Sequence, residues 1–108
     1  MTLADLRNCI SSVSTFQNKV TYRAWPVNKA PKLPFVCYLA TGTDNFDADN
    51  KVYHVIQNAD VELYTAKKDV QTEEALEAVF AENGLTWEKS ETYLDDESCY
   101  EIIYSITL

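Results

Sequence analysis

Residues 51–84 read KVYHVIQNADVELYTAKKDVQTEEALEAVFAENG, and this stretch decides the fold. Its first part, residues 51–65, is dense in β-branched and aromatic side chains, which predicts a long strand. After a short charged break, apolar residues recur at intervals of three and four, which predicts an amphipathic helix. Asp69 is suited to cap the start of this helix, and Gly84 is suited to end it. A long strand followed directly by such a helix indicates a sheet with a helix packed against it.

The chain before residue 51 begins with a predicted helix over residues 3–14. Thr2 and Asp5 have the spacing of a capping box, and the apolar residues that follow share one helical face. The remaining predictions for this part are a short strand over residues 20–25, a proline-rich extended connection over 26–34, a central strand over 35–40 and a polar hairpin loop over 42–50.

Two further strands are predicted after the second helix, over residues 85–94 and 99–108, with a turn at 95–98. In the last strand apolar and polar residues alternate, as expected when one face is buried. Residues 57–58 interrupt the apolar pattern of the long strand, which predicts a bulge there. The order of elements predicts a single α+β domain over residues 1–108. Its sheet is expected to be mixed and mostly antiparallel, with four to five strands and two helices packed on one face.

The composition is that of a folded domain. With 108 residues, of which 46% are apolar and 12% aromatic, the chain is expected to form one packed core. Cys9, Cys37 and Cys99 lie far apart without the spacing of metal ligands, so they are predicted to be reduced and buried. No apolar run is long enough to cross a bilayer, and no leader-like segment opens the sequence. We therefore expect a protein without membrane contact, in the cytoplasm of the cell that makes it.

The net charge of −8 is divided unevenly along the chain. Residues 1–68 contain eight Lys and Arg against six Asp and Glu, whereas residues 69–108 contain one Lys against eleven Asp and Glu. The acidic part would repel phosphates, so no specific nucleic acid partner is expected. The asymmetry either keeps the protein soluble or attracts opposite surfaces to each other, within one molecule or between copies.

No arrangement of residues predicts catalysis. The single histidine, His54, lies within a strand, and no known motif places a Cys or Ser beside it. The acids of the second helix are predicted to form a solvated face rather than an acid–base pair. The 42–50 loop fails as an EF-hand, because Lys51 or Ile56 falls where an oxygen ligand is required. We expect no enzyme activity, no metal and no cofactor.

Several segments resemble the small tail-completion proteins of long-tailed bacteriophages, which are also called tail terminators or tail-to-head joining proteins. The likeness covers about residues 22–108 and leaves out the first helix. Its segments are APKLPFVCY (30–38), DNFDADNKVY (44–53), VELYT (61–65), Lys68 and Asp69 with Glu73 and Glu77, and Tyr100 with Tyr104 in the last strand. The order and spacing of these segments carry the resemblance.

This resemblance implies a structural virion protein with an α+β fold and a mixed sheet. Such a protein would cap the tail tube of a phage or prophage as a sixfold ring, a homohexamer, and would join the tail to the head. Its partners would be its own copies, the tail tube protein and the head–tail connector protein. It would act in the host cytoplasm during assembly and then in the tail or neck of the virion. The resemblance carries no catalytic residue over to this chain.

A ring needs two different surfaces that meet. From the residues, we predict a basic proline-rich surface opposite an acidic helix surface, with one aromatic anchor in the 42–50 loop. These candidate interface residues are Arg23, Lys29 and Lys32 on the basic side, Glu73, Glu74 and Glu77 on the acidic side, and Phe46 in the loop. The alternative function is an acidic phage-encoded inhibitor that mimics nucleic acid and binds a host protein, which the basic first part of the chain fits less well. A small hydrolase is the third and least favoured hypothesis.

Overall fold

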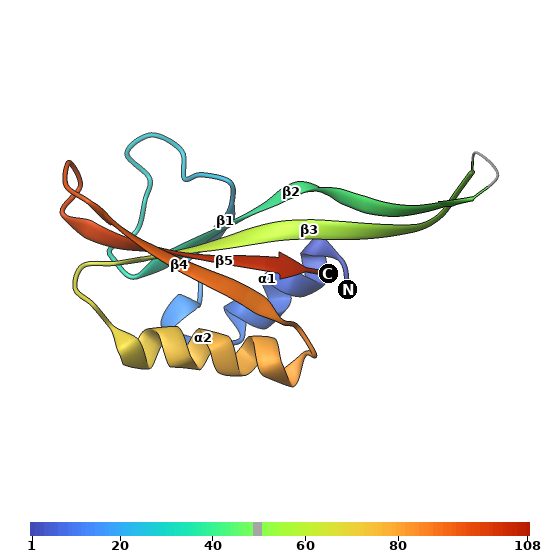
Figure 1. Ribbon diagram of the computed structural model, residues 1–108. Coiled ribbons are helices and arrows are strands. Elements are labelled where there is room, and N and C mark those ends of the chain that lie inside the picture. Colours follow the sequence, from blue (N-terminus) through green and yellow to red (C-terminus); the bar gives the residue numbers. More distant parts are fainter. Residues whose placement is uncertain (49–50) are drawn as a thin grey trace.

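The computed structural model describes the backbone of residues 1–48 and 51–108, and the side chains of residues 1–44 and 55–108. Its helices and strands follow one another in the order α1, η1, β1, β2, β3, α2, β4, β5, where η1 is a short 3-10 helix (Figure 1). Their bounds are Leu3–Ser11 for α1, Ser14–Phe16 for η1, Val20–Tyr22 for β1, Phe35–Ala48 for β2, Lys51–Thr65 for β3, Val70–Glu82 for α2, Trp87–Leu94 for β4 and Cys99–Thr107 for β5.

The strands form one mixed sheet in the order β1-β2-β3-β5-β4. β1 runs parallel to β2, and the other neighbouring pairs are antiparallel. Both helices lie on the same side of the sheet, below it in Figure 1, and the loop between β1 and β2 rises on the other side. The predicted α+β fold, with a mostly antiparallel sheet and two helices on one face, is confirmed.

The start of α1 is fixed by the predicted capping box. Oγ1 of Thr2 accepts a hydrogen bond from the N–H of Asp5, and Oδ2 of Asp5 accepts one from the N–H of Thr2, at 3.1 and 3.0 Å. The helix ends at Ser11, earlier than the predicted residue 14. The reason is that Val13 has an extended backbone, from which η1 turns Phe16 into the core.

The boundaries of α2 also have local causes. The carboxylate of Asp69 accepts a hydrogen bond from the N–H of Thr72, as predicted for an N-cap. Gly84 follows the helix with a φ of 71°, a left-handed conformation that glycine adopts without strain. β1 is shorter than predicted, because Arg23 has a φ of 64° and leaves the strand conformation directly after Tyr22.

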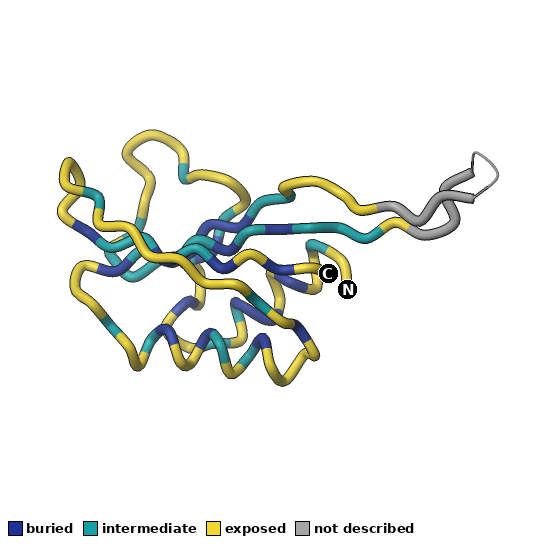
Figure 2. Tube along the Cα trace, in the orientation of Figure 1, coloured by how far each residue is buried: buried dark blue, intermediate teal, exposed yellow. Residues whose placement is uncertain are grey.

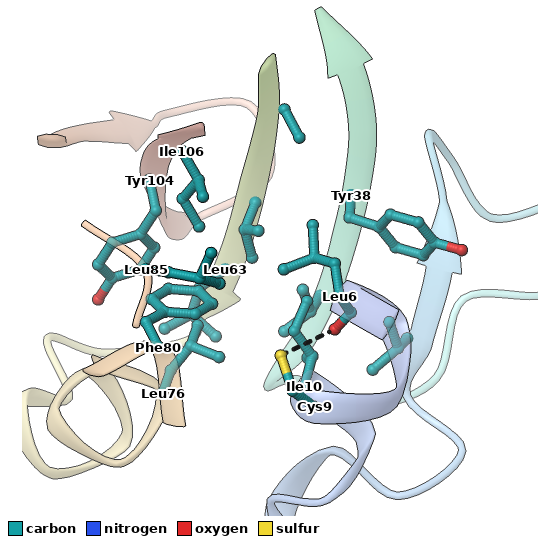
Figure 3. Close-up of a cluster of buried hydrophobic side chains, with 14 of the residues drawn as sticks. Leu6, Cys9, Ile10, Tyr38, Leu63, Leu76, Phe80, Leu85, Tyr104 and Ile106 are labelled. Atoms are coloured by element: carbon teal, nitrogen blue, oxygen red, sulfur yellow. Dashed lines mark hydrogen bonds between the residues drawn. The ribbon is translucent and has the colours of Figure 1, made fainter. Parts of the chain in front are cut away.

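The core lies between the sheet and the two helices. Figure 3 shows Leu76 and Phe80 of α2 and Leu6 and Ile10 of α1 pointing toward the strands above them. Phe80 packs edge-on against Tyr104 of β5, with ring centroids 5.4 Å apart. Buried residues accordingly alternate along β3 and β5 and recur on the sides of the helices that face the sheet (Figure 2).

The outer parts of β2 and β3, residues 42–48 and 51–57, form a two-stranded ribbon that extends beyond the rest of the molecule (Figure 1). β1 pairs with β2 only over residues 36–38, and β5 pairs with β3 from Asn58 onward, with one further backbone hydrogen bond from the N–H of Leu108 to the carbonyl oxygen of Gln57. Beyond Gln57 the described strands of the ribbon pair with each other alone. The prediction of a loop over 42–50 is therefore wrong for residues 42–48, which belong to β2. The last two residues of the predicted loop lie outside the described part of the chain. This polar sequence forms a strand because pairing across the ribbon satisfies its backbone groups. The molecule measures 51 × 29 × 23 Å along its principal axes.

A β-bulge at Thr41 marks the point where the ribbon leaves the body of the sheet. Ala40 pairs with Ala59 and Gly42 pairs with Asn58, so Thr41 is an extra residue in β2. The irregularity lies at the predicted level of the sheet, but the additional residue belongs to β2 and not to β3. Bulges of this kind bend a strand and increase its local twist.

The three cysteines are free and buried, as predicted. The Sγ of Cys9 donates to the carbonyl oxygen of Leu6 at 3.1 Å within α1 (Figure 3). Burial, together with the negative charges of Glu62 and Glu101, raises the pKa of Cys37 to about 11. The Cys37 thiol therefore stays protonated at neutral pH and is a poor nucleophile.

Leu63→Ala is expected to lower the free energy of unfolding by about 2–5 kcal/mol, because it opens a cavity in a packed core. The Leu63 side chain is 0% exposed, whereas Val55 on the ribbon is 58% exposed and provides a control. Val55→Ala should change the free energy of unfolding by about 0.5 kcal/mol or less. Urea unfolding followed by tryptophan fluorescence measures both variants, and equal effects would contradict this assignment of the core.

Candidate interface surfaces

A cluster of charged side chains joins α2 to β4. The carboxylate of Glu73, 2% exposed, lies 2.8 Å from Nζ of Lys68 and 2.7 Å from Nζ of Lys89. Lys89 also lies 2.8 Å from Glu77, and Lys68 pairs with Glu91 of β4. We call these five residues the charge cluster. Because its lysines come from the segment before α2 and from β4, the cluster holds the helix against the edge of the sheet.

The position of Glu73 corrects the prediction of a solvated acidic surface on α2. Of the three glutamates in that prediction, Glu73 is buried, Glu77 is half-buried and Glu74 is exposed. Glu73 precedes Leu76 by three residues and Phe80 by seven, so it lies on the same helical stripe as these core residues. This spacing is visible in the sequence and could have located the buried carboxylate.

The charge state of Glu73 depends on its two lysines. Burial disfavours the charged carboxylate, but hydrogen bonds from Lys68 and Lys89 outweigh burial and lower the pKa of Glu73. Hydrogen bonds to carboxylates, that of Glu73 first, raise the pKa of Lys68 to about 12. The Tyr104 hydroxyl donates to Glu77 at 2.7 Å, and burial together with this bond raises the pKa of Tyr104. At neutral pH the cluster therefore consists of ion pairs around a neutral phenol.

The predicted basic residues are exposed and lie in the loop between β1 and β2. They are Arg23, Lys29 and Lys32. Within this loop the N–H of Lys29 donates to the carbonyl oxygen of Pro26 at 2.9 Å. Trp25 packs edge-on against Phe35 of β2, with ring centroids 6.0 Å apart, and anchors the loop to the sheet. We call residues 26–32 the basic turn.

Phe46, the predicted aromatic anchor, belongs to the ribbon. Its backbone lies in β2 and pairs with His54, while its side chain lies outside the described residues. The predicted interface residues thus occupy three separate parts of the molecule. These are α2 below the sheet, the loop with the basic turn above it, and the ribbon that extends to one side (Figure 1).

The sheet face turned away from the helices carries acidic residues that the prediction missed. Side chains of neighbouring strands form rows across this face. The rows are Cys37–Glu62–Ile103–Ser90, Phe35–Tyr64–Glu101–Thr92 and Leu39–Asp60–Ser105–Glu88. We call the part of this face formed by β3, β5 and β4, with Leu39 at its border, the open face. Four side chains in these rows are carboxylates, and the rows contain no Lys or Arg.

The carboxylates of the open face lack the compensation that Glu73 receives. Burial, and then the charges of Glu101 and Asp60, raise the pKa of Glu62. The hydroxyl of Tyr64 donates to Glu101 at 2.7 Å, and that of Ser105 donates to Asp60 at 3.1 Å. These hydrogen bonds satisfy single oxygen atoms but bring no positive charge. The face is therefore suited to bind a partner that supplies cations.

A hollow of about 500 Å³ lies at the end of the open face near the ribbon. Its polar lining includes Asn58, Asp60, Glu88, Ser105 and Thr107. Among the described residues that line the hollow there is no histidine or lysine that would activate a nucleophile. Among the described residues no group of three or more His, Cys, Asp and Glu could hold a metal ion. No helix in this part of the chain is long and apolar enough to cross a membrane.

No protein-family model and no curated protein matches this sequence. Solved structures, by contrast, include a similar fold. One of them is a chain in the structure described as the virion of a native gene transfer agent (GTA) particle. That chain is similar to the present one with a TM-score of 0.55 at 10% sequence identity. The likeness covers 91% of this chain and 81% of that chain, so it extends over the helices and the sheet together.

Glu73→Gln is expected to lower the free energy of unfolding at pH 7 by about 1–3 kcal/mol, because it removes charge-assisted hydrogen bonds from a buried position. Glu74→Gln is the matched control, since Glu74 is adjacent and exposed. That control should change the free energy of unfolding by about 0.5 kcal/mol or less. Urea unfolding at pH 7 measures both variants.

The same pair of variants gives a pH test. The pKa of Glu73 is lower in the folded chain than in the unfolded chain, where it is about 4.3. Its stabilisation is therefore present above that pH and is lost as the pH falls toward the folded-state pKa. Below about pH 4.3 the native chain and Glu74→Gln should lose stability more steeply than Glu73→Gln. If the stability of the native chain, Glu74→Gln and Glu73→Gln falls in parallel with pH, the lysines do not lower the pKa of Glu73.

Proposed function

We propose that this chain is a structural protein of a tailed, phage-like particle. In this role it caps the end of the tail tube as a ring of its own copies, six in number, and joins the tail to the head connector. It acts by binding the tail tube protein and the connector protein, without catalysis and without a cofactor. Assembly takes place in the host cytoplasm, and the protein then stays in the tail or neck of the particle.

The observation that carries this proposal is the fold. A chain from the virion of a gene transfer agent particle has a similar fold over 91% of the present chain. The segments that resemble tail-completion proteins fall in β2, β3, α2 and β5 or directly before β2 and α2, so the resemblance and the structural likeness cover the same part of the chain. Both point to a component of a particle rather than to a free enzyme.

The shape of the molecule also supports a role in an assembly. Among the described residues the ribbon pairs with no other strand, and an isolated two-stranded hairpin is only marginally stable in water. Contact with another molecule would stabilise it. β4 lies at the edge of the sheet, with one row of backbone groups free of strand partners among the described residues. A subunit with a projecting ribbon and a free edge is suited to contact several neighbours at once.

The charge cluster weakens the alternative of an acidic inhibitor. Glu73 and Glu77, which the alternative would use as surface charges, are paired with lysines of the same chain. The acids of the open face are separated by apolar side chains such as Ile103, unlike the continuous charge of a phosphate backbone. The structural role is therefore the better supported of the two.

Localisation in particles tests the proposed function. We expect antibody labelling or electron cryo-microscopy of purified particles to place the protein at the junction of head and tail. Disruption of its gene should leave heads and tails unjoined, and expression of the gene from a plasmid should restore joined particles. Absence of the protein from purified particles, or normal joining without it, would contradict the proposal.

Shortening the ribbon should separate folding from assembly. Replacing residues 45–55 by a two-residue Asn-Gly turn keeps the native pair of Asp44 with Ile56 and removes only strand pairs that contact no other strand, so the melting temperature should change by only a few degrees. The shortened chain is expected to fail to restore joined particles in cells that lack the native gene. A shortened chain that restores joining would show that the ribbon is dispensable, whereas one that unfolds would show that the ribbon stabilises the body.

A further inference from the structure

We infer that the open face binds the basic turn of a second copy of this chain. This inference rests on the proposed function, because the ring proposed there requires two different surfaces of one chain to meet. Each copy carries both surfaces, so no other component is needed. The open face takes the role that the sequence analysis assigned to Glu73, Glu74 and Glu77.

The open face is chemically mixed. Asp60, Glu62 and Glu101 are half-buried carboxylates, and Leu39 and Ile103 in neighbouring positions are half-buried apolar side chains. The helices lie on the other side of the sheet and do not cover this face, whereas the loop between β1 and β2 rises on the same side as the face (Figure 1). A partner must therefore bring positive charge and an apolar group together. A simple metal cation lacks the apolar group, and a nucleic acid has charge of the wrong sign.

The basic turn has this composition. Val27 at its tip is 86% exposed, and Lys29 and Lys32 follow it as exposed cations. The hydrogen bond from Lys29 to Pro26 closes the turn, and Trp25 anchors its base. Because the turn is already ordered in the single chain, docking it loses little conformational entropy.

The groups of the two surfaces are complementary. The lysines of the turn match the carboxylates of the open face, and Val27 matches Ile103 and Leu39. Within one copy, Arg23 is the cation that acts on Glu62, and its effect is smaller than that of burial and the neighbouring acids. Each exposed ion pair contributes little by itself. The contact is therefore weak between free copies and becomes strong when a tail end holds the copies side by side.

Charge reversal on each surface tests the contact with the purified chain. Asp60→Lys with Glu88→Lys alters the open face, and Lys29→Glu with Lys32→Glu alters the basic turn. Each double variant is expected to weaken self-association about tenfold, and the chain with all four changes should recover it. Sedimentation equilibrium at low salt, at concentrations up to about 1 mM, measures the association.

A matched control separates this contact from general charge effects. Glu74→Lys with Glu82→Lys reverses two exposed acids on α2, on the opposite side of the sheet. This control and the open-face variant make the net charge less negative by the same amount, so reduced repulsion would strengthen association in both. The open-face variant should associate more weakly than the native chain, while the control should associate at least as well as the native chain. This difference would identify the open face as the binding surface.

Two results would overturn the inference. One is a native chain that stays monomeric at about 1 mM, and the other is unchanged association of the open-face variant. Circular dichroism checks that each variant folds. Should the double lysine variant unfold, Asp60→Asn with Glu88→Gln replaces it and should weaken association about threefold. A negative outcome leaves the proposed function standing, since that function is tested by the position of the protein in particles.

Discussion

The apolar contact of the two helices with one face of the sheet determines where the other features of this protein lie. Leu6 and Ile10 of α1 and Leu76 and Phe80 of α2 bury that face, and no helix is left for the opposite one. The core also stops before the ribbon, because its described buried residues include none between Ala40 and Ala59. A core built on one side thus leaves an uncovered face and a projecting ribbon, which are the surfaces available to other molecules.

The charge cluster extends this core to the edge of the sheet. Glu73 continues the apolar stripe of α2, and its carboxylate is tolerated in a buried position because Lys68 and Lys89 approach it from the two sides. The stems of such lysines cover apolar surface while their ammonium groups stay partly in water. Nζ of Lys89 lies 5.7 Å from the ring centre of Tyr104, so the same side chain also packs on an aromatic ring of β5.

Sequence patterns predicted the features that have local causes. The capping box of Thr2, the N-cap of Asp69 and the alternation in β5 each depend on residues a few positions apart, and all are present. The basic residues Arg23, Lys29 and Lys32 are exposed on the surface, as the proline-rich sequence around them indicated. Two features depend on pairing with another strand and were missed. The ribbon forms because the polar residues 42–48 pair with residues 51–57, and the buried position of the Glu73 carboxylate depends on Lys89, which a different strand supplies. The acids of the open face alternate with core residues in the sequence, but only the strand order β3-β5-β4 brings them together.

The bulge at Thr41 divides the β2–β3 hairpin into two parts that evolution can alter independently. Adding one residue to each strand near the tip would lengthen the ribbon by about 3.3 Å and leave the register of the body unchanged. Inserting a single residue between the bulge and Val36 would instead exchange the two faces of β2 and expose its core side chains. The reach of the ribbon can therefore change at its tip without disturbing the body, while the bulge and the strand behind it stay under structural constraint.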